Sequence, residues 1–268
     1  MSTEKANMIE KKSKTKNYSG YGRYQIEDKL ELQLPKTEIL FERKSENQFS
    51  YYRKNSENKI TNKTIPRKEK ELQIEMAPIL PLNLPQKKTD DLMFLRLTNS
   101  VFVEKESEIE FLIQFPIEIG LFIINPKDGS KDFFDCFTCE PMHSRFGLYG
   151  IPDGGKLCMY SKVAVLSKHE YDEYIFAIMK VSLENTLDHG VSVGKLVFPV
   201  SYHDIYYQDG KSEAHIDDIK ATIKNDIANE VIDINHINYS KKNNEWKLAP
   251  RTEPKIEKKA FTMDKGFD

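Results

Sequence analysis

One stretch of the sequence decides the fold: residues 108–124 read EIEFLIQFPIEIGLFII. Its first half, residues 108–115, alternates apolar with mostly polar side chains, and this period of two predicts a strand with one fully buried face. Pro116 interrupts the alternation, which resumes over residues 117–124. Because proline cannot donate a hydrogen bond to a neighbouring strand, we expect a bulge, a bend or an edge position there. The turn-forming residues 125–129 (NPKDG) then end the second strand.

The same alternation recurs on both sides of this stretch, in short segments separated by turn signals. Segments of this kind occupy residues 30–34, 72–76, 92–103, 157–166, 174–183, 191–200 and 204–207. Turn-forming residues at 152–155 (PDGG) and 209–210 (DG) suit hairpins between them. Many short strands with regular turns are typical of a sandwich or barrel. We therefore predict an all-β fold, an antiparallel β-sandwich, built either as one body or as two packed β subdomains.

Residues 212–239 fit two patterns. Isoleucines at positions 216, 219, 223 and 227 would share one face of a helix that begins near Ser212. Apolar residues at 219, 221 and 223, followed by 232 and 234, would instead line two strands. We favour two strands, because β-branched isoleucine suits a pleated surface and the surrounding chain is β. A helix is the alternative.

Composition divides the chain into an acidic body and basic ends. The apolar fraction of 39% is low and the charged fraction of 31% is high for a globular protein, which indicates solvated tails. Residues 1–17 hold five Lys against two Glu, and residues 240–268 hold eight Lys or Arg against five acids. We predict a disordered basic tail over 1–17 and a flexible tail over 240–268. Between the tails we predict an N-terminal β subregion over 18–87 and a β-sandwich body over 88–239. The Pro-rich segment 78–85 is the best candidate for the boundary between these two regions.

The sequence predicts a soluble cytoplasmic protein. Its first residues carry positive charge without an apolar segment behind them, unlike a secretory signal. The longest apolar stretches are too short to cross a bilayer, so we expect no membrane span. Three cysteines, an odd number, argue against a disulfide framework and for a reducing compartment.

The cysteines and a nearby histidine form a candidate metal site. Cys136 and Cys139 are spaced as Cys-x-x-Cys, and His143 and Cys158 follow, which together supply the ligand types that tetrahedral zinc uses. His143 and Cys158 do not form a second paired motif, so we favour free thiols at the end of a strand. We therefore predict no cofactor, with structural zinc as the less favoured alternative.

Residues 42–70 are a candidate surface for nucleic acid. They hold nine Lys or Arg against four Glu, and aromatic residues lie among the cations. Cations for phosphate beside rings for stacking are what a single-strand binder needs. The candidate residues are Arg43, Lys44, Tyr51, Tyr52, Arg53 and Lys54. The favoured alternative is a hairpin with a solvated polar side and residues 55–58 at its tip, because the body of the chain is acidic.

Glu118 is a candidate for acid–base chemistry, since burial inside an apolar strand could raise its pKa. We favour a carboxylate that reaches solvent or pairs with a cation, because alternation turns it away from Ile117 and Ile119. Spacing assigns it no partner carboxylate, as a glycosidase or aspartic protease would need. The sequence also has no metalloprotease, nucleophile-elbow, phosphate-loop or dinucleotide-binding motif. We therefore predict no catalytic residues and lean against an enzyme.

Several short motifs resemble one protein family. They are Gly22-Arg23-Tyr24, Tyr51-Tyr52-Arg53, Pro81-Leu82-Asn83-Leu84-Pro85, Phe115-Pro116-Ile117-Glu118-Ile119-Gly120, and Leu148-Tyr149-Gly150-Ile151-Pro152 followed by Gly155. Over residues 18–240 the chain resembles the archaeal domain-of-unknown-function family 432, and the run from Phe115 to Gly120 is the most specific of the motifs. The resemblance implies a β-rich domain and an archaeal cytoplasm. It transfers no catalytic residues, and the cysteines are not part of its pattern.

Our leading functional hypothesis is a noncatalytic binding or protein-interaction module, with a protein as the expected partner. It is motivated by abundant aromatic residues, short antiparallel strands and missing catalytic motifs. A nucleic-acid-associated protein that uses residues 42–70 and the basic tails is the alternative. An enzyme of unidentified class is the second alternative.

Overall fold

The fold is built from strands. A computed structural model describes residues 18–81, 91–140, 146–151, 153–166, 172–226, 229–239, 245–252 and 260–264. In these residues every regular element is a β-strand, most neighbouring strands are antiparallel and the sheets pack together, which confirms the all-β prediction. No helix in the described ranges has the length and apolar character to cross a membrane.

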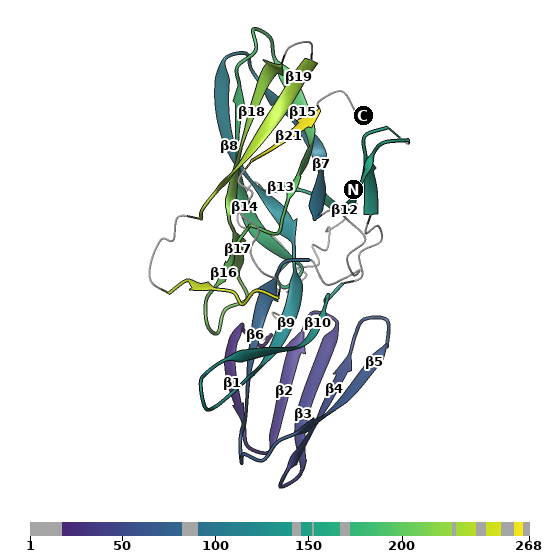
Figure 1. The fold of residues 1–268 in the computed structure, drawn as a ribbon, viewed down its shortest axis with the longest axis vertical. Helices are drawn as coiled ribbons and strands as arrows, with labels where there is room; N and C mark the ends of the chain where they lie inside the picture. Colours follow the sequence, from purple (N-terminus) through teal and green to yellow (C-terminus); the bar gives the residue numbers. More distant parts are fainter. Residues whose placement is uncertain are drawn as a thin grey trace, which may run out of the picture.

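The strands form two lobes, one at each end of the molecule (Figure 1). The N-terminal lobe, at the lower end of the view, has two antiparallel four-stranded sheets. The first contains, in order, β2 (Lys29–Leu34), β3 (Thr37–Ser45), β4 (Gln48–Lys54) and β5 (Ile60–Pro66). The second contains β1 (Gly22–Ile26), β6 (Leu72–Ile79), β9 (Glu118–Ile124) and β10 (Lys131–Phe137). Aromatic rings meet between the sheets, with the centroids of Tyr51 and Phe134 5.0 Å apart, so this lobe is a β-sandwich.

The C-terminal lobe also has two sheets. The smaller contains, in order, β11 (Phe146–Tyr149), β12 (Lys156–Val163), β7 (Leu92–Val103) and β15 (Val191–Pro199). The main path of the larger contains β20 (Lys247–Leu248), β16 (Ile205–Tyr207), β17 (Ala214–Ile216), β14 (Phe176–Asn185), β18 (Asp218–Asp226), β19 (Asn229–Ile237) and β21 (Ala260–Asp264). Beside that path, β8 (Ser107–Pro116) pairs with β14 and with β13 (Val165–Leu166).

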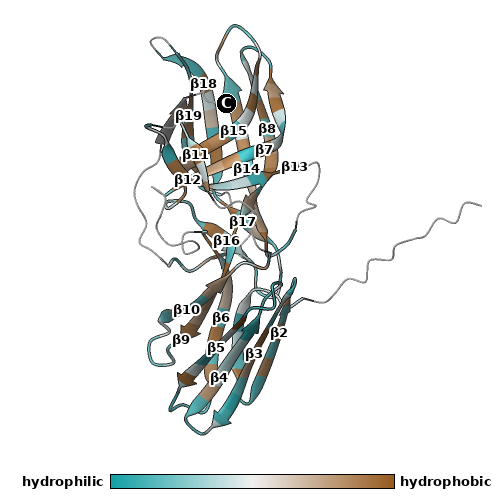
Figure 2. Ribbon diagram, turned by 90° about the vertical axis from the view of Figure 1, so that its right-hand side faces the viewer, coloured by the Kyte–Doolittle hydropathy of each residue, from teal (hydrophilic) through white to brown (hydrophobic). Residues whose placement is uncertain are grey.

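Three strand pairs in this lobe are parallel: β12 with β7, and β14 with both β17 and β18. Parallel neighbours need long connections, so each pair joins segments that lie far apart in the sequence. Hydrophobic and hydrophilic residues alternate along strands of both lobes (Figure 2), as expected for strands with one face toward a core.

The stretch that decides the fold connects the two lobes. Its first strand, β8, pairs with β14 in the C-terminal lobe, and its second, β9, pairs with β6 and β10 in the N-terminal lobe. The break predicted at Pro116 is therefore the place where the chain passes from one lobe to the other. Residues 118–137, which the predicted boundary assigns to the body over 88–239, complete a sheet of the N-terminal lobe.

Glu75 on β6 connects the lobes at their junction. Its buried carboxylate accepts hydrogen bonds from the Tyr207 hydroxyl on β16 at 3.0 Å and from the Lys131 ammonium at 2.7 Å. The Arg23 guanidinium donates a third at 3.2 Å. A carboxylate is tolerated away from water here because two cations and a hydroxyl compensate its charge.

Residues 212–239 form strands, as favoured from the sequence. Ile219, Ala221 and Ile223 line the buried face of β18, and β19 places Ile234 opposite Ala221 and Ile232 opposite Ile223. Cross-strand pairs of this kind stabilise a sheet.

The predicted C-terminal tail is partly ordered. Residues 245–252 and 260–264 include the short strands β20 and β21. Trp246, Ala249 and Met263 are buried. The free energy gained by burying these side chains offsets the conformational entropy lost when the segments become ordered. The predicted N-terminal tail, residues 1–17, and the second half of the Pro-rich segment, residues 82–85, lie outside the described residues.

Candidate functional site

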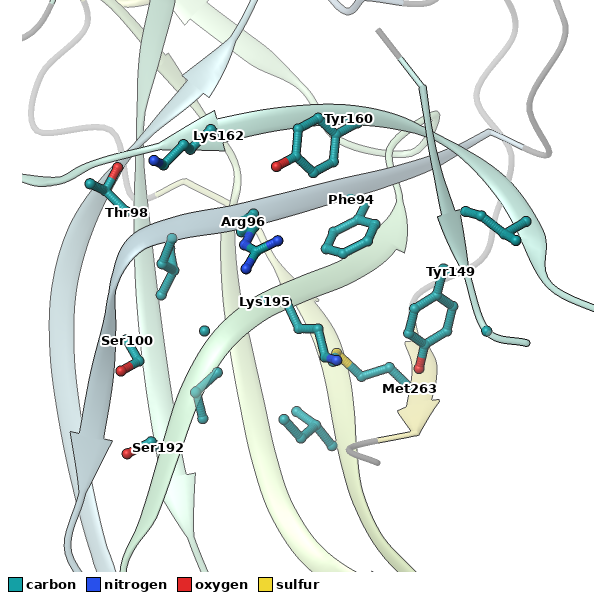
Figure 3. Close-up of a pocket in the computed structure, with 16 residues that line it drawn as sticks. Phe94, Arg96, Thr98, Ser100, Tyr149, Tyr160, Lys162, Ser192, Lys195 and Met263 are labelled. Atoms are coloured by element: carbon teal, nitrogen blue, oxygen red, sulfur yellow. The ribbon is translucent and has the colours of Figure 1, made fainter. Parts of the chain in front are cut away.

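A cleft of about 580 Å³ lies on one face of the smaller sheet of the C-terminal lobe (Figure 3). We call it the basic cleft. The residues from the smaller sheet that carry its chemistry are Phe94, Arg96, Thr98, Ser100, Tyr149, Tyr160, Lys162, Ser192 and Lys195. Ile232 of β19 and Met263 of β21 close one side of it. Its size is that of small-molecule sites in proteins, which occupy about 300–1,000 Å³.

Strand alternation on β7 directs alternate side chains into the basic cleft. Phe94 and Arg96 face it, whereas Met93 and Leu95 point the other way and are buried in the core. The apolar face anchors the strand and thereby holds the opposite face in place. The local sequence MFLRLT thus separates a packing face from a face with aromatic and polar groups.

The registers of the neighbouring strands repeat this arrangement. On β12, Tyr160 lies beside Phe94 and Lys162 lies beside Arg96. On β15, a bulge between Val193 and Lys195 brings Lys195 opposite Arg96. Residues from four strands therefore form two rows across the sheet. The aromatic row contains Phe94, Tyr160 and, from β11, Tyr149. The cationic row, one strand repeat away, contains Arg96, Lys162 and Lys195.

The aromatic row has a defined packing. The ring centroids of Phe94 and Tyr160 lie 5.4 Å apart and those of Phe94 and Tyr149 lie 6.3 Å apart, in edge-to-face arrangements. Gly147 on β11 makes room for two of the rings, because a Cβ there would lie 3.0 Å from Tyr160 and 3.3 Å from Phe94. All three rings are half-buried, so they keep surface on which a ligand could pack.

The electrostatics of the basic cleft favour an anion. Among the described residues that line it there are three cations and no carboxylate. Arg96 and Lys162 form no ion pair with any residue in the described part of the chain. Arginine offers a planar fork that matches phosphate or carboxylate oxygens, and lysine adds a point charge. Clefts lined by one sign of charge concentrate ligands of the opposite sign.

The residues predicted to bind nucleic acid do not gather on one surface. They lie on β3 and β4 and comprise Arg43, Lys44, Tyr51, Tyr52, Arg53 and Lys54. Tyr51 and Arg53 point into the N-terminal sandwich, where both donate hydrogen bonds to Asp135. The Arg43 guanidinium lies 4.3 Å from the ring centroid of Phe49. Lys44 pairs with the Glu42 carboxylate. Four members of the set therefore have partners within the lobe, and alternation turns Lys44, Tyr52 and Lys54 to the face opposite the other three.

The predicted zinc ligands are divided between the lobes. Cys136 lies on β10 and Cys139 just after it, whereas Cys158 lies on β12 of the C-terminal lobe. His143 lies outside the described residues. Burial raises the pKa of the Cys136 and Cys139 thiols to about 12 each, which favours the protonated form over the thiolate that binds metal. In the described ranges, no three or more His, Cys, Asp or Glu side chains are placed to hold a metal ion.

Glu118 lies in the N-terminal lobe on β9, far from the basic cleft in the fold. Its side chain is 1% exposed. From the sequence we favoured a carboxylate that either reaches solvent or pairs with a cation, and the first of these does not occur. The reason is that β9 is an inner strand, with β6 on one side and β10 on the other. Its charge adds to burial in raising the pKa of Cys136. Glu118 is therefore a neighbour of Cys136. Of the short motifs, Leu148, Tyr149 and Gly150 line the basic cleft.

A second polar cluster, centred on Asp217, lies between β17 and β18. Its fully buried carboxylate accepts hydrogen bonds from His236 Nε2 at 2.7 Å, the Tyr206 hydroxyl at 3.1 Å, and the backbone amides of Tyr239 at 2.7 Å and Asp204 at 2.8 Å. Burial by itself would raise the pKa of Asp217, but the donors hold the pKa below its usual range. Four donors on one carboxylate indicate a structural hub that ties β16 and β19 to the core.

The pKa of Asp218, the next residue, is shifted in the opposite direction, and this shift affects the stability of the fold. Burial raises its pKa to about 6, although the backbone amide of Lys180 donates to it at 3.2 Å. The folded chain thus holds this proton more tightly than the unfolded chain, whose carboxyl has a pKa of about 4, so stability falls as the pH rises from about 4 to about 6. We expect Asp218→Asn, which keeps the acceptor oxygen, to raise the free energy of unfolding by about 1–2 kcal/mol at pH 7.

Urea unfolding of Asp218→Asn at pH 7 and pH 4 measures this effect. The gain should be present at pH 7 and nearly absent at pH 4, where the folded wild type is protonated and about half of the unfolded chain is as well. Asp226→Asn, at the exposed end of the same strand, is the control and should change little at either pH. A variant that is less stable than wild type at pH 7 would contradict the prediction.

The basic cleft could not be predicted from the sequence, because the residues that line it come from separate segments of the chain. Each of β7 and β12 carries an aromatic residue followed two positions later by a cation: Phe94 and Arg96 on one, Tyr160 and Lys162 on the other. This repeated spacing of an aromatic residue and a cation is the one local signal of the site in these two strands. The parallel pairing that brings the two copies together joins segments about sixty residues apart and leaves no local trace.

Comparison with known proteins identifies the family. The chain matches one family model, described as “Protein of unknown function (DUF432)”, over residues 20–264. It therefore belongs to this family, as the short motifs indicated. Searches of curated proteins and of solved structures found no match.

Proposed function

We propose that this member of the family is a noncatalytic binding module and that it holds an anionic ligand in the basic cleft. The observation that carries the proposal is the convergence of Arg96, Lys162 and Lys195, from three strands, on one concave surface. Cations, hydroxyl groups and aromatic rings are groups that bind and orient a ligand. The rigid sheet behind them supports binding without a large rearrangement.

A bound anion would compensate the positive charge of Arg96 and Lys162. Arg96 and Lys162 occupy paired positions of β7 and β12, and neither forms an ion pair with a residue in the described part of the chain. Like charges on directly adjacent positions of a sheet are destabilising. A bound anion removes this repulsion and forms charge-assisted hydrogen bonds with both cations.

Tripolyphosphate is a suitable probe, because it offers charge without a ring. We expect wild-type protein to bind it, with an affinity that falls as salt rises. The double substitution Arg96→Gln and Lys162→Gln should weaken binding at least tenfold, since it removes two charge-assisted contacts. Isothermal titration calorimetry at two salt concentrations measures both effects.

A charge-matched variant controls for net charge. Lys59→Gln with Lys127→Gln removes two exposed lysines of the N-terminal lobe, so the net charge equals that of the cleft variant. Its affinity should stay close to that of wild type. Failure of the wild type to bind tripolyphosphate, or an equal loss in both double variants, would overturn the proposal.

We also propose a reducing cytoplasm as the compartment, which three unbridged cysteines support. A protein partner, and a nucleic-acid role for residues 42–70, stay predictions from the sequence.

A further inference from the structure

The aromatic row gives the basic cleft more than an anion needs. The largest rings of the core, such as Phe115 and Phe198, are fully buried, whereas Phe94, Tyr149 and Tyr160 are half-buried beside open space. A simple anion would contact only the cationic row. A ligand with a flat ring of its own would cover the exposed ring surface and gain stacking energy as well.

The spacing of the two rows matches a ligand with a ring and a charge. Phe94 and Arg96 are separated by one two-residue repeat of β7, and Tyr160 and Lys162 by the same repeat of β12. That repeat is about 6.7 Å. In a nucleotide, one sugar of similar length separates the base from its phosphate. A base on the aromatic row therefore places the phosphate on the cationic row.

The rest of the basic cleft is consistent with this arrangement. After Arg96, the next side chains of β7 with polar groups in the cleft are the hydroxyl-bearing Thr98 and Ser100. Ser192 of β15 adds a third hydroxyl group. These groups lie beyond the cations, where a sugar or a further phosphate would continue. Figure 3 shows Arg96 next to Phe94 along β7, with Thr98 and Ser100 farther along the same strand.

We propose that the basic cleft binds a nucleotide unit, with the base against Phe94 and Tyr160 and the phosphate against Arg96, Lys162 and Lys195. This inference rests on the proposed function and specifies the ligand class of the same site. The unit is either a free nucleotide or part of a single strand, since both present the same base and phosphate. A cleft of about 580 Å³ has room for such a unit.

The test compares ligands that lack one part of a nucleotide. AMP, ribose 5-phosphate and adenosine are titrated into wild-type protein by calorimetry, and a short oligothymidylate by fluorescence anisotropy. We expect AMP to bind at least tenfold more tightly than ribose 5-phosphate, because stacking is lost without the base. AMP should also bind at least tenfold more tightly than adenosine, which has no phosphate.

Leucine substitutions then locate the base. Phe94→Leu with Tyr160→Leu keeps apolar bulk but removes two stacking faces, so the preference for AMP over ribose 5-phosphate should fall about tenfold. Phe102→Leu is the matched control, because Phe102 lies on the same strand, is 62% exposed and does not line the cleft. Its preference for AMP should equal that of wild type. Thermal unfolding of each variant confirms that it is folded.

The outcomes separate the two proposals. Binding of tripolyphosphate with equal affinities for AMP and ribose 5-phosphate would overturn the nucleotide inference and keep the anion-binding function. Absence of tripolyphosphate binding would overturn both. If the preference for AMP is present, tighter binding of the oligothymidylate than of AMP assigns the site to a single strand, and weaker binding assigns it to a free nucleotide.

Discussion

Replacing Asp135 with alanine is expected to lower the free energy of unfolding by about 3–5 kcal/mol. Asp135 lies on β10, with 11% of its side chain exposed, and joins the two sheets of the N-terminal lobe. Its carboxylate accepts hydrogen bonds from the Tyr51 hydroxyl at 2.6 Å, the Arg53 guanidinium at 3.0 Å and the Lys63 ammonium at 3.1 Å. Without Asp135, the Arg53 guanidinium would lose its counter-ion in a site where water barely reaches it, which is why the loss is large.

Urea unfolding at pH 7 measures this loss, and the same strand provides its control. Asp132 is exposed three positions earlier, so Asp132→Ala removes the same group without a buried partner. Its effect should stay within about 0.5 kcal/mol. Asp135→Asn keeps one acceptor oxygen and should fall between the two. Equal stabilities of Asp135→Ala and Asp132→Ala would show that Asp135 does not hold the sheets together.

The same contacts show a limit of composition as a guide to the surface formed by residues 42–70. Counting charges over residues 42–70 cannot show which way each side chain points. Tyr51 and Arg53 alternate with Tyr52 along β4, and both meet Asp135, which lies more than eighty positions away in the sequence. These two members of the candidate set thus belong to the polar interior of the sandwich.

Local patterns were sufficient where the structure depends on local physics. The period of two over residues 108–124 predicts both strands, and Pro116 marks the break between them. The β-branched residues of β18 and β19 favour strands over a helix for the same reason. These predictions depend only on how side chains alternate along a pleated chain.

Pairing between distant segments could not be predicted in this way. Nothing in residues 108–124 shows that β8 and β9 belong to different lobes, because each strand selects its neighbours by tertiary packing. The basic cleft has the same origin, since Arg96 and Lys162 become neighbours only through the parallel pairing of β7 and β12. Parallel strands are joined by long connections, so sequence distance carries little information about them.

Asp217→Ala is expected to be as damaging to the C-terminal lobe, with a loss of about 3–5 kcal/mol. Its carboxylate is fully buried and satisfies two side-chain donors and two backbone amides. Alanine would leave His236 and the amides of Tyr239 and Asp204 without their acceptor, and unsatisfied buried donors are costly. Asp217→Asn should also destabilise, because its amide nitrogen would replace an oxygen that accepts two hydrogen bonds.

The pH dependence identifies the charge of Asp217 as the cause. Because its donors lower the pKa of Asp217 in the folded state, its stabilising contribution is present above the unfolded carboxyl pKa of about 4 and is lost as the pH falls through the folded value. The stability difference between wild type and Asp217→Asn should therefore be full at pH 7 and shrink below about pH 4. Asp218→Asn, one residue away, should show the opposite sign at pH 7. If both asparagine variants shift stability in the same direction at pH 7, the assignment of these two buried carboxylates to opposite roles is wrong.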